Sequence, residues 1–491
     1  MTWILDHWLV LFFFALYGAL LVHHARMGKR RTRGLADYVV GGRSIGGITV
    51  GLSFFATYSS TNSFVGFAGQ AYSYGLPWLL IAPFAVVFTV VAWTFIAPRM
   101  REFTASLNSV TIPDFIGFRF GSNPARVFAA FIVLFASFLY MTAVFKGLGN
   151  LLEAFLGIPY TTAIIIVFFI AVAYTVVGGL HSVIRTDAIL AVVMFLAAVI
   201  LFSGTVRAAG GLGSFFAVRS DPAGAALFSW NAAMPFGMLL GIIVAGTFKL
   251  VVEPRQLSRF FALEDQRAVR RGTWVSTAAF LVVYSLLVPI GIYARNLFPT
   301  GVTDTDTIIP SLLAGGVVFP PLASAFLLVA LMAAAMTSLD SVLLVMASTC
   351  QRDIIGLWRR RHVTETTAVR HTRLYVALFA LVTALIALNP PGGIVSLTAF
   401  SGSLYAVCFF PAIAFGLHWS RGNGSAVLTS FVVGLTILVS LTLWPLGFPI
   451  HPMFPAIAMS TITYFVISLY ARPHEAPEVQ RLFAPEAATV D

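Results

Sequence analysis

The sequence predicts an all-α polytopic membrane protein, and three observations lead to that fold class. Of the 491 residues, 59% are hydrophobic and only 10% are charged, whereas a soluble domain carries about 25% charged residues. The apolar residues gather in segments of about 20 residues, the length that spans a bilayer as a helix. The basic residues fall in alternate loops between these segments, as expected when positively charged loops face the cytoplasm.

About thirteen apolar segments are candidate membrane-spanning helices. In chain order they lie near residues 6–25, 46–72, 77–97, 126–155, 159–178, 187–208, 234–252, 274–297, 321–349, 374–388, 395–417, 425–446 and 453–471. With the N-terminus outside and the C-terminus inside, most basic residues face the cytoplasm. The inner clusters are then 26–33, 99–119, 255–271 and 352–373, and outside fall Arg207, Arg219 and Arg295.

The ends of the chain and its net charge fit this topology. No basic stretch precedes the first apolar segment, so we interpret that segment as a retained helix rather than a signal peptide. The polar residues after Arg472, rich in Pro and Glu, predict a short disordered tail. The net charge of +11 reflects the inner loops, so we expect no nucleic-acid partner. Cys350 and Cys408 lie in or beside apolar segments, where thiols act as small hydrophobes.

The segment 321–349 carries oxygen-bearing side chains where a lipid-facing helix would be apolar. Thr337, Ser338 and Ser341 lie roughly on one helical face, and a carboxylate, Asp340, lies among them. A carboxylate at bilayer depth is costly and is typical of a functional site, and hard oxygens suit a small hard cation. Two structural alternatives stay open. The hydroxyls can bond to carbonyls one turn back, and Asp340 can pair with a lysine or arginine.

The segment 46–72 is the stronger of two candidates for an interrupted helix. Seven of the eleven positions from Ser53 to Ser63 are Ser, Thr or Asn, which is more polarity than close packing of small residues requires. Broken helices at membrane depth occur where they line a cavity and supply carbonyl groups to ions. The second candidate is the segment 234–252, which contains Gly237, Gly241, Gly246 and Thr247.

Several short motifs, in order along the chain, resemble the sodium:solute symporter family, which includes proline, pantothenate, glucose, sialic acid, iodide and monocarboxylate transporters. They are residues 41–44, 52–60, 66–72, 174–179 with Thr186 and Asp187, 256–262, and 334–341 with Asp353. The stretch 56–66 is most similar to the iodide and monocarboxylate members. The resemblance implies a LeuT-type fold of two inverted five-helix repeats.

That fold implies a domain organisation. We expect an extra N-terminal helix and basic loop (1–45), a first repeat (46–208), an external loop (209–233), a second repeat (234–417), two additional helices (418–471) and a short cytoplasmic tail (472–491).

The resemblance also implies the ion sites. A sodium ion would be bound by the carbonyl groups of Ala56, Ser59 and Ala334 and by the hydroxyls of Thr337 and Ser338. A second ion or proton site would be formed by Asp187, Asp340 and Ser341. Asp340 stands where the family pattern has a hydroxyl. Two carboxylates close together raise the pKa of one of them, so the site could bind a proton, a second sodium, or both in exchange. Asp187 also has a structural alternative, as the N-cap of the helix 187–208.

For the solute, the expected position is beside the break in the segment 46–72, with Tyr58, Ser60 and Ser63 as candidate ligands. Two lysines lie inside apolar segments, and a cation facing a cavity favours an anionic solute. Lys249 lies four residues before Glu253 and so has a ready partner, whereas Lys146 has only Glu153 nearby in its segment. Lys146 is therefore the preferred solute contact.

The residues and the resemblance together predict a sodium-coupled secondary symporter, not an enzyme, of the plasma membrane (the inner membrane of a bacterium). Its expected partners are sodium, a small organic solute and the lipid bilayer, with no obligate protein partner. A small monocarboxylate or other small anion is the preferred solute, followed by an amino acid such as proline, and then a sugar. Coupling to protons in place of sodium stays open. The alternatives from other classes are a transporter-like membrane sensor, an intramembrane aspartyl protease and a channel.

Overall fold

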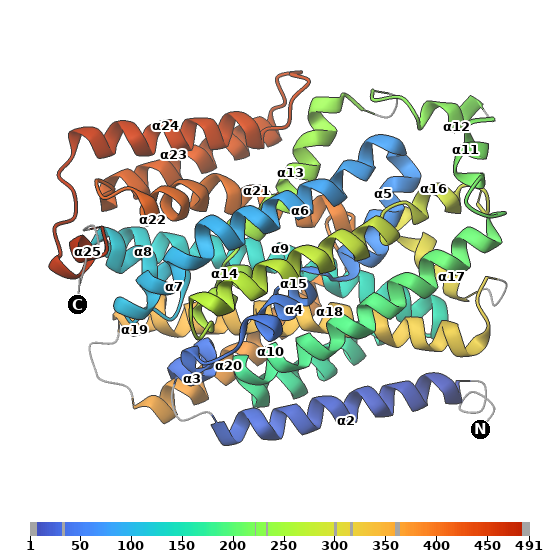
Figure 1. Cartoon of the computed structure of the whole chain (residues 1–491), viewed down its shortest axis with the longest axis horizontal. Coiled ribbons are helices and arrows are strands. Elements are labelled where there is room, and N and C mark those ends of the chain that lie inside the picture. The colour runs from blue at the N-terminus through green and yellow to red at the C-terminus, as the bar shows by residue number, and fades with distance from the viewer. Residues whose placement is uncertain are drawn as a thin grey trace.

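The computed structural model describes residues 7–31, 35–220, 222–231, 234–298, 302–314, 318–358 and 364–483. Regular structure in this part of the chain is helical, and ten helices are long and apolar enough to cross a membrane. Helix α2 (Trp8–Arg31) runs along one edge of the molecule, and α23 (Gly424–Leu443) and α24 (Met453–Tyr470) run along the opposite edge (Figure 1). The predicted all-α membrane fold is confirmed. Arg33 and residues 359–361 of the predicted inner basic clusters lie outside the described residues.

The first half of the bundle contains two bent spans and two long helices. Its elements are α3 (Leu35–Val40), η1 (Gly41–Arg43), α4 (Gly47–Tyr58), η2 (Asn62–Gly66), α5 (Phe67–Tyr74), η3 (Leu76–Leu80), α6 (Ile81–Val91), η4 (Ala92–Ile96), α7 (Ala97–Ser106), α8 (Ile112–Phe120), α9 (Asn123–Leu156) and α10 (Tyr160–Ala208). Gly179 has φ 67° and ψ 174°, which divides α10 into two consecutive helices. A residue with a β-carbon resists that conformation.

The second half contains one broken span and several longer helices. Its elements are α11 (Ser214–Ala217), η5 (Val218–Ser220), α12 (Pro222–Ala226), α13 (Phe236–Val252), α14 (Pro254–Phe261), α15 (Gln266–Leu287), α16 (Ile290–Ala294), η6 (Thr305–Thr307), α17 (Ile308–Ala314), α18 (Pro321–Thr349), η7 (Cys350–Ile355), α19 (Gly356–Trp358), α20 (Glu365–Ala387), α21 (Ile394–Phe410), η8 (Pro411–Phe415), α22 (Gly416–His418) and α25 (Pro477–Arg481).

Three predicted spans correspond to apolar helices that are shorter than a full crossing: Trp8–His24, Gly47–Tyr58 and Tyr160–Val176. The count of about thirteen crossings and the orientation of the termini therefore stay predictions.

The second interruption does not lie where the glycines of 234–252 predict it. Helix α13 is continuous from Phe236 to Val252. Gly241 serves close packing, because a β-carbon there would lie 1.9 Å from the β-carbon of His451. The break comes next, at Glu253, whose ψ of 127° is extended, and Pro254 then begins α14. Proline lacks an N–H group and disfavours a helical residue before it, so the helix ends there.

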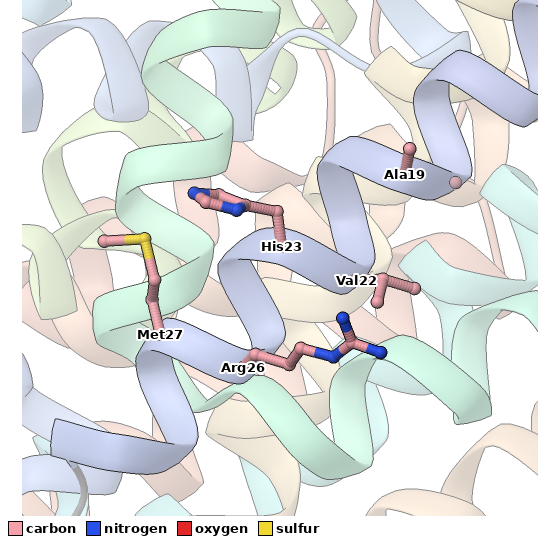
Figure 2. A pocket seen from close by; sticks show the side chains of 6 residues that line it. Ala19, Val22, His23, Arg26 and Met27 are labelled. Atoms are coloured by element: carbon pink, nitrogen blue, oxygen red, sulfur yellow. The ribbon is translucent and has the colours of Figure 1, made fainter.

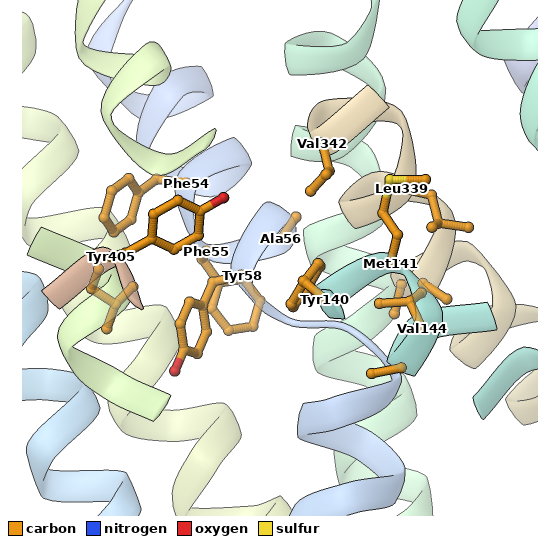
Figure 3. Packing of buried hydrophobic residues seen from close by; sticks show 14 of the residues in the cluster. Phe54, Phe55, Ala56, Tyr58, Tyr140, Met141, Val144, Leu339, Val342 and Tyr405 are labelled. Atoms are coloured by element: carbon orange, nitrogen blue, oxygen red, sulfur yellow. The ribbon is translucent and has the colours of Figure 1, made fainter. Parts of the chain in front are cut away.

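The centre of the bundle is packed with aromatic side chains around the first break. The Phe280 ring of α15 lies 5.2 Å from the Phe55 ring and 5.5 Å from the Tyr58 ring, centroid to centroid. Tyr58, Tyr140 and Tyr405 converge on the region where α4 unwinds (Figure 3). The two breaks therefore lie in the buried interior of the protein.

The prediction of a disordered tail is wrong for residues 472–483. The Phe483 ring packs edge-on against Phe103, with centroids 5.3 Å apart. Arg99 donates a hydrogen bond to the carbonyl oxygen of Leu482 at 2.8 Å. These contacts hold the segment against α7. Residues 484–491 lie outside the described part of the chain.

Candidate functional site

The break in α4 is made by two serines. Helix α4 ends at Tyr58, and Ser59 is extended, with φ −75° and ψ 102°. The hydroxyl of Ser60 accepts a hydrogen bond from the N–H of Asn62 at 3.2 Å, which satisfies the N-terminus where the helix resumes. Short polar side chains that bond to nearby backbone favour such a break over a continuous helix. The break leaves backbone carbonyl groups at the end of α4 free to bind other partners.

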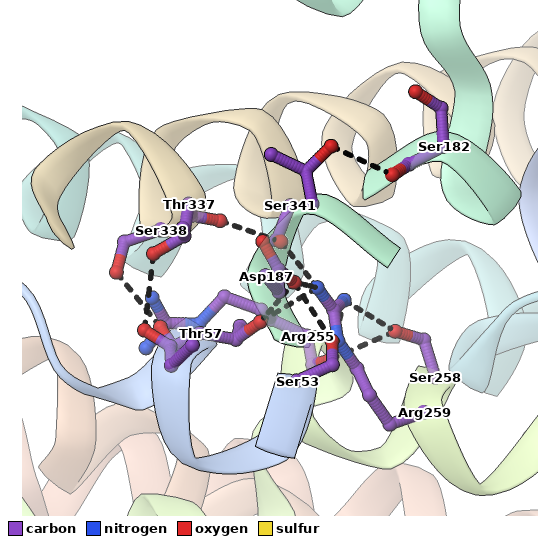
Figure 4. A network of polar contacts seen from close by, with 12 residues as sticks. Ser53, Thr57, Ser182, Asp187, Arg255, Ser258, Arg259, Thr337, Ser338 and Ser341 are labelled. Carbon is purple, nitrogen blue, oxygen red and sulfur yellow. Dashed lines mark hydrogen bonds and ion pairs between the residues drawn. The ribbon is translucent and has the colours of Figure 1, made fainter. Parts of the chain in front are cut away.

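Two hydroxyls of α18 reach those carbonyl groups (Figure 4). Thr337 donates to the carbonyl oxygens of Ala56 at 3.0 Å and Ala334 at 2.8 Å. Ser338 donates to the carbonyl oxygen of Thr57 at 2.7 Å. The structure thus brings Ala56, Ala334, Thr337 and Ser338 together in the buried core, with Ser59 two residues beyond Thr57. The cluster consists of neutral oxygens, the kind of ligand that sodium accepts.

The predicted second ion site contains an arginine that the sequence analysis assigned to an inner loop. The Arg259 guanidinium of α14 is fully buried and lies 3.0 Å from the Asp187 carboxylate. The same nitrogen donates to the hydroxyls of Thr57, at 2.7 Å, and of Ser341. Asp187 also accepts a hydrogen bond from Ser53 at 2.7 Å. The guanidinium therefore joins α4, α10, α14 and α18 at the place expected for a second cation (Figure 4).

Asp340 lies apart from this ion pair. Its carboxylate accepts a hydrogen bond from the hydroxyl of Thr175, and no ion pair involves it within the described residues. The structure thus brings Asp187 and Ser341 onto Arg259 and leaves Asp340 with a neutral partner. Asp187 is not an N-cap, because its helix begins at Gly179, two turns earlier. The predicted start of this helix at residue 187 is wrong.

The four predicted solute ligands all have protein partners. Tyr58 donates to the carbonyl oxygen of Gly246 at 2.6 Å, Ser60 caps the restarted helix, and Ser63 lies 2.7 Å from the hydroxyl of Tyr284. Lys146 is 2.8 Å from Asp306 and 3.4 Å from Asp304. Sequence spacing within one segment did not reveal these acids, which lie about 160 residues away in the chain.

The second break, between α13 and α14, gathers charged side chains that the sequence analysis did not assign to the site. Glu253 pairs with Arg255 at 3.0 Å, and Lys249 lies one turn before Glu253 on the same face of α13. All three side chains are 2% exposed or less. The two breaks are linked by the Gln256 amide, which, oriented to satisfy both neighbours, donates to the Phe54 carbonyl at 3.2 Å and accepts from the Tyr58 N–H at 3.2 Å.

Two surface pockets lie away from the two breaks. One lies along α2 (Figure 2) and is lined by Gly18, Ala19, Val22, His23, Arg26 and Met27. A second, nearly apolar pocket lies between α2, α10 and α18. A third, small pocket of about 20 Å³ does reach the second break, and it is lined by Pro254 and Ser258 of α14 and by Ser341 of α18, among others.

Comparison with known proteins gives a consistent result. A sequence model described as "Sodium:solute symporter family" matches residues 38–434. The sodium/pantothenate symporter of Haemophilus influenzae is 29% identical over 93% of this chain and 94% of its own. The sodium/pantothenate symporter of Escherichia coli is 30% identical, and the match covers 89% of this chain and 91% of that one. The high-affinity proline transporter PutP of Bacillus subtilis is 29% identical, and the match covers 90% of this chain and 93% of that one.

Among solved structures, a sodium-coupled sialic acid symporter in a substrate-bound outward-open state is similar, with a TM-score of 0.80. It is 17% identical, and the match covers 96% of this chain and 99% of that one. The transporter Mhp1 in a closed conformation gives a TM-score of 0.56 at 14% identity. That match covers 92% of this chain and 95% of the Mhp1 chain. These neighbours share the LeuT-type fold, so the expectation of that fold is confirmed.

Proposed function

The chain belongs to the sodium:solute symporter family, and from that premise we propose that it imports a small organic monocarboxylate together with sodium by alternating access. As a sodium-coupled symporter it is an integral membrane protein. We place it in the plasma membrane, the inner membrane of a bacterium, with its N-terminus outside and its C-terminus inside. The breaks at Ser59–Ser60 and Glu253–Pro254 fall at similar places in the two proposed repeats, 46–208 and 234–417, which supports the inverted-repeat organisation.

The contact between the broken end of α4 and the hydroxyls of α18 carries the proposal. We assign the sodium shell to the carbonyl groups of Ala56, Ser59 and Ala334 and the hydroxyls of Thr337 and Ser338. A bound ion would replace the hydrogen bonds that Thr337 and Ser338 now make and would tie α4 to α18. Because the ligands are neutral, the ion can also leave, as a transport cycle requires.

We propose that this is the single sodium site. The Arg259 guanidinium already neutralises Asp187, so a further cation there would face a buried positive charge. Asp340 has no cationic partner in the described part of the chain, and an unpaired carboxylate in an apolar interior is costly. It therefore carries a proton in the resting state, and it is the candidate for a coupled proton.

The relatives support a carboxylate solute, because pantothenate and proline, the named substrates of the curated relatives, both carry that group. A proline-like amino acid is the second candidate and a sugar the third. Lys146 is less suited to bind the solute than the sequence analysis expected, since two carboxylates already share its charge. We propose that it holds α9 to the segment before α17.

The test is uptake into proteoliposomes that contain the purified full-length chain. An inward sodium gradient should drive accumulation of radiolabelled pantothenate or proline, and an equal gradient of choline should not. Equal uptake in both conditions would contradict sodium coupling. A transporter-like sensor would bind a solute in the same preparation without accumulating it.

A further inference from the structure

The charges at the α13–α14 break do not balance within the described residues. Lys249 and Arg255 are both cationic, Glu253 is the acid beside them, and all three are buried. Glu253 pairs with one nitrogen of Arg255 at 3.0 Å. The other two guanidinium nitrogens, Nε and Nη1, are buried and have no hydrogen-bond partner in the described part of the chain. Unsatisfied buried donors are costly, and they are expected where a ligand binds.

Lys249 lies beside Arg255 and is also poorly satisfied. Its ammonium is 4.3 Å from the centroid of the Tyr140 ring, and the guanidinium carbon of Arg255 is 4.1 Å from the same centroid. The two cations therefore share one aromatic ring of α9. The hydrogen bond of Lys249 runs to the Thr398 carbonyl oxygen at 3.3 Å, which is long for a charged donor.

Packing against α21 directs the lysine to this place. A β-carbon on Gly402 would lie 2.0 Å from the Ala245 carbonyl oxygen and 3.0 Å from Cδ of Lys249. The glycine thus lets the lysine side chain cross α21 toward the Thr398 carbonyl. Ser401, one turn after Thr398 on α21, has a buried hydroxyl without a hydrogen-bond partner.

There is room beside these groups. A β-carbon on Gly246, one turn before Lys249 on α13, would meet no atom within 4 Å, although Gly246 is buried. The hydroxyl of Tyr58 reaches the Gly246 carbonyl from the α4 break, so this part of α13 lies next to that break.

We infer that Lys249 and Arg255 form the site that binds the carboxylate group of the transported solute. The inference rests on the proposed function and names the residues that give it an anionic substrate class. Arg255 offers Nε and Nη1 to a carboxylate, and Lys249 adds a point charge. The N-terminus of α14, which begins at Pro254, adds the partial positive charge of the helix dipole.

The experiment measures binding to purified full-length protein, with sodium alone, with pantothenate, propionate or L-proline added, and with panthenol, in which an alcohol replaces the carboxylate of pantothenate. The variants are Lys249→Met, which keeps most of the apolar stem, Arg255→Gln and Glu253→Gln. Arg421→Gln, at an exposed residue, is the matched control. The readouts are the dissociation constant and the melting temperature.

We expect wild type to bind a carboxylate well and panthenol poorly. Lys249→Met and Arg255→Gln should each weaken carboxylate binding by about 30-fold or more. Glu253→Gln should strengthen it, because it frees Arg255 from a competing acid. Arg255→Lys should restore part of the lost affinity. A purely structural ion cluster would instead make both Arg255→Gln and Glu253→Gln less stable, with no opposite effects on affinity.

The change in melting temperature with sodium alone distinguishes a failure of this inference from a failure of the proposed sodium coupling. If sodium still stabilises the variants while carboxylate binding is lost, the variants are folded and the anion site is supported. The inference is overturned if Lys249→Met and Arg255→Gln both keep the preference for pantothenate over panthenol. It is also overturned if the wild-type protein shows no such preference, or if it binds none of the three carboxylates. Wild type that does not respond to sodium would instead count against the proposed function.

Discussion

The two broken helices differ in the chemistry of their breaks. The carbonyl groups at the α4 break are contacted by the neutral hydroxyls of Thr337 and Ser338, whereas the α13–α14 break holds Lys249, Glu253 and Arg255. The α4 break is made by serines that compete with the helix, and the other by a proline that cannot continue it. The difference teaches that one scaffold can present two breaks of opposite chemistry: one suits the proposed cation site, which uses dipoles, and the other suits the proposed anion site, which uses full charges.

Arg259 connects the two regions, and its removal should have the largest effect. Arg259→Gln leaves the buried Asp187 carboxylate without its cation, which we expect to lower the free energy of unfolding by about 3–5 kcal/mol. Thermal unfolding in detergent measures the loss. The double variant with Asp187→Asn should recover much of it, because no charge is then left unpaired. A single variant as stable as wild type would mean that the two breaks are not joined through this ion pair.

Ser338→Ala tests the neutral break. Removing one of five proposed sodium ligands should raise the sodium concentration for half-maximal uptake by about tenfold, equivalent to ~1.4 kcal/mol. The control is Ser348→Ala in the same helix, whose hydroxyl bonds only to the Val345 carbonyl oxygen at 3.1 Å. If both variants need the same sodium concentration as wild type, the hydroxyl of Ser338 is not a sodium ligand.

His451 tests how firmly the helix before the charged break is held. Burial lowers its pKa to about 4, below the value of about 6.5 expected when unfolded. The unfolded chain therefore binds a proton first, and this contribution to stability is present above pH 6.5 and is lost as the pH falls toward 4. Between pH 7 and 5 the loss should be about 1 kcal/mol, reduced by the partial exposure of the ring.

The measurement for His451 is thermal unfolding at both pH values. His451→Leu should remove that share of the acid sensitivity. An identical pH dependence in the variant would show that the ring does not control the packing of its loop on Gly241 and α13.

Asp340→Asn should have the smallest effect on sodium. We expect an unchanged sodium requirement, since the carboxylate lies outside the proposed shell, and a flatter dependence of uptake on alkaline pH, since asparagine resembles the protonated acid. Uptake measured across a pH series at saturating sodium tests this. A raised sodium requirement would instead make Asp340 a sodium ligand.

The sequence predicts the fold class well because apolar segments and polar interruptions are local signals. The α4 break was visible in seven polar residues within eleven positions, and Thr337 and Ser338 were placed beside it through the resemblance. Arg259 was misassigned because an arginine near a helix end resembles a loop residue until its partner, Asp187, is brought from 72 positions away.

The second break was misplaced for a related reason. The glycines in 234–252 are compatible with either a helix break or close helix packing, and the sequence alone does not distinguish the two. The close approach of His451 to Gly241 shows that this glycine serves packing. The Glu253–Pro254 pair was the better local signal. A proline directly after a charged residue at the end of an apolar run indicates a helix end.

The buried Arg259, which takes the place of a second cation beside Asp187, affects the net charge that one transport cycle moves across the membrane. A guanidinium that belongs to the chain returns with it and is never delivered across the membrane, so it adds nothing to the charge moved per turnover. One sodium carried with one monovalent anion then makes an electroneutral cycle. Uptake would be set by the sodium concentration gradient and be unaffected by a potassium diffusion potential, unless a proton bound at Asp340 travels with them and makes the cycle voltage-sensitive.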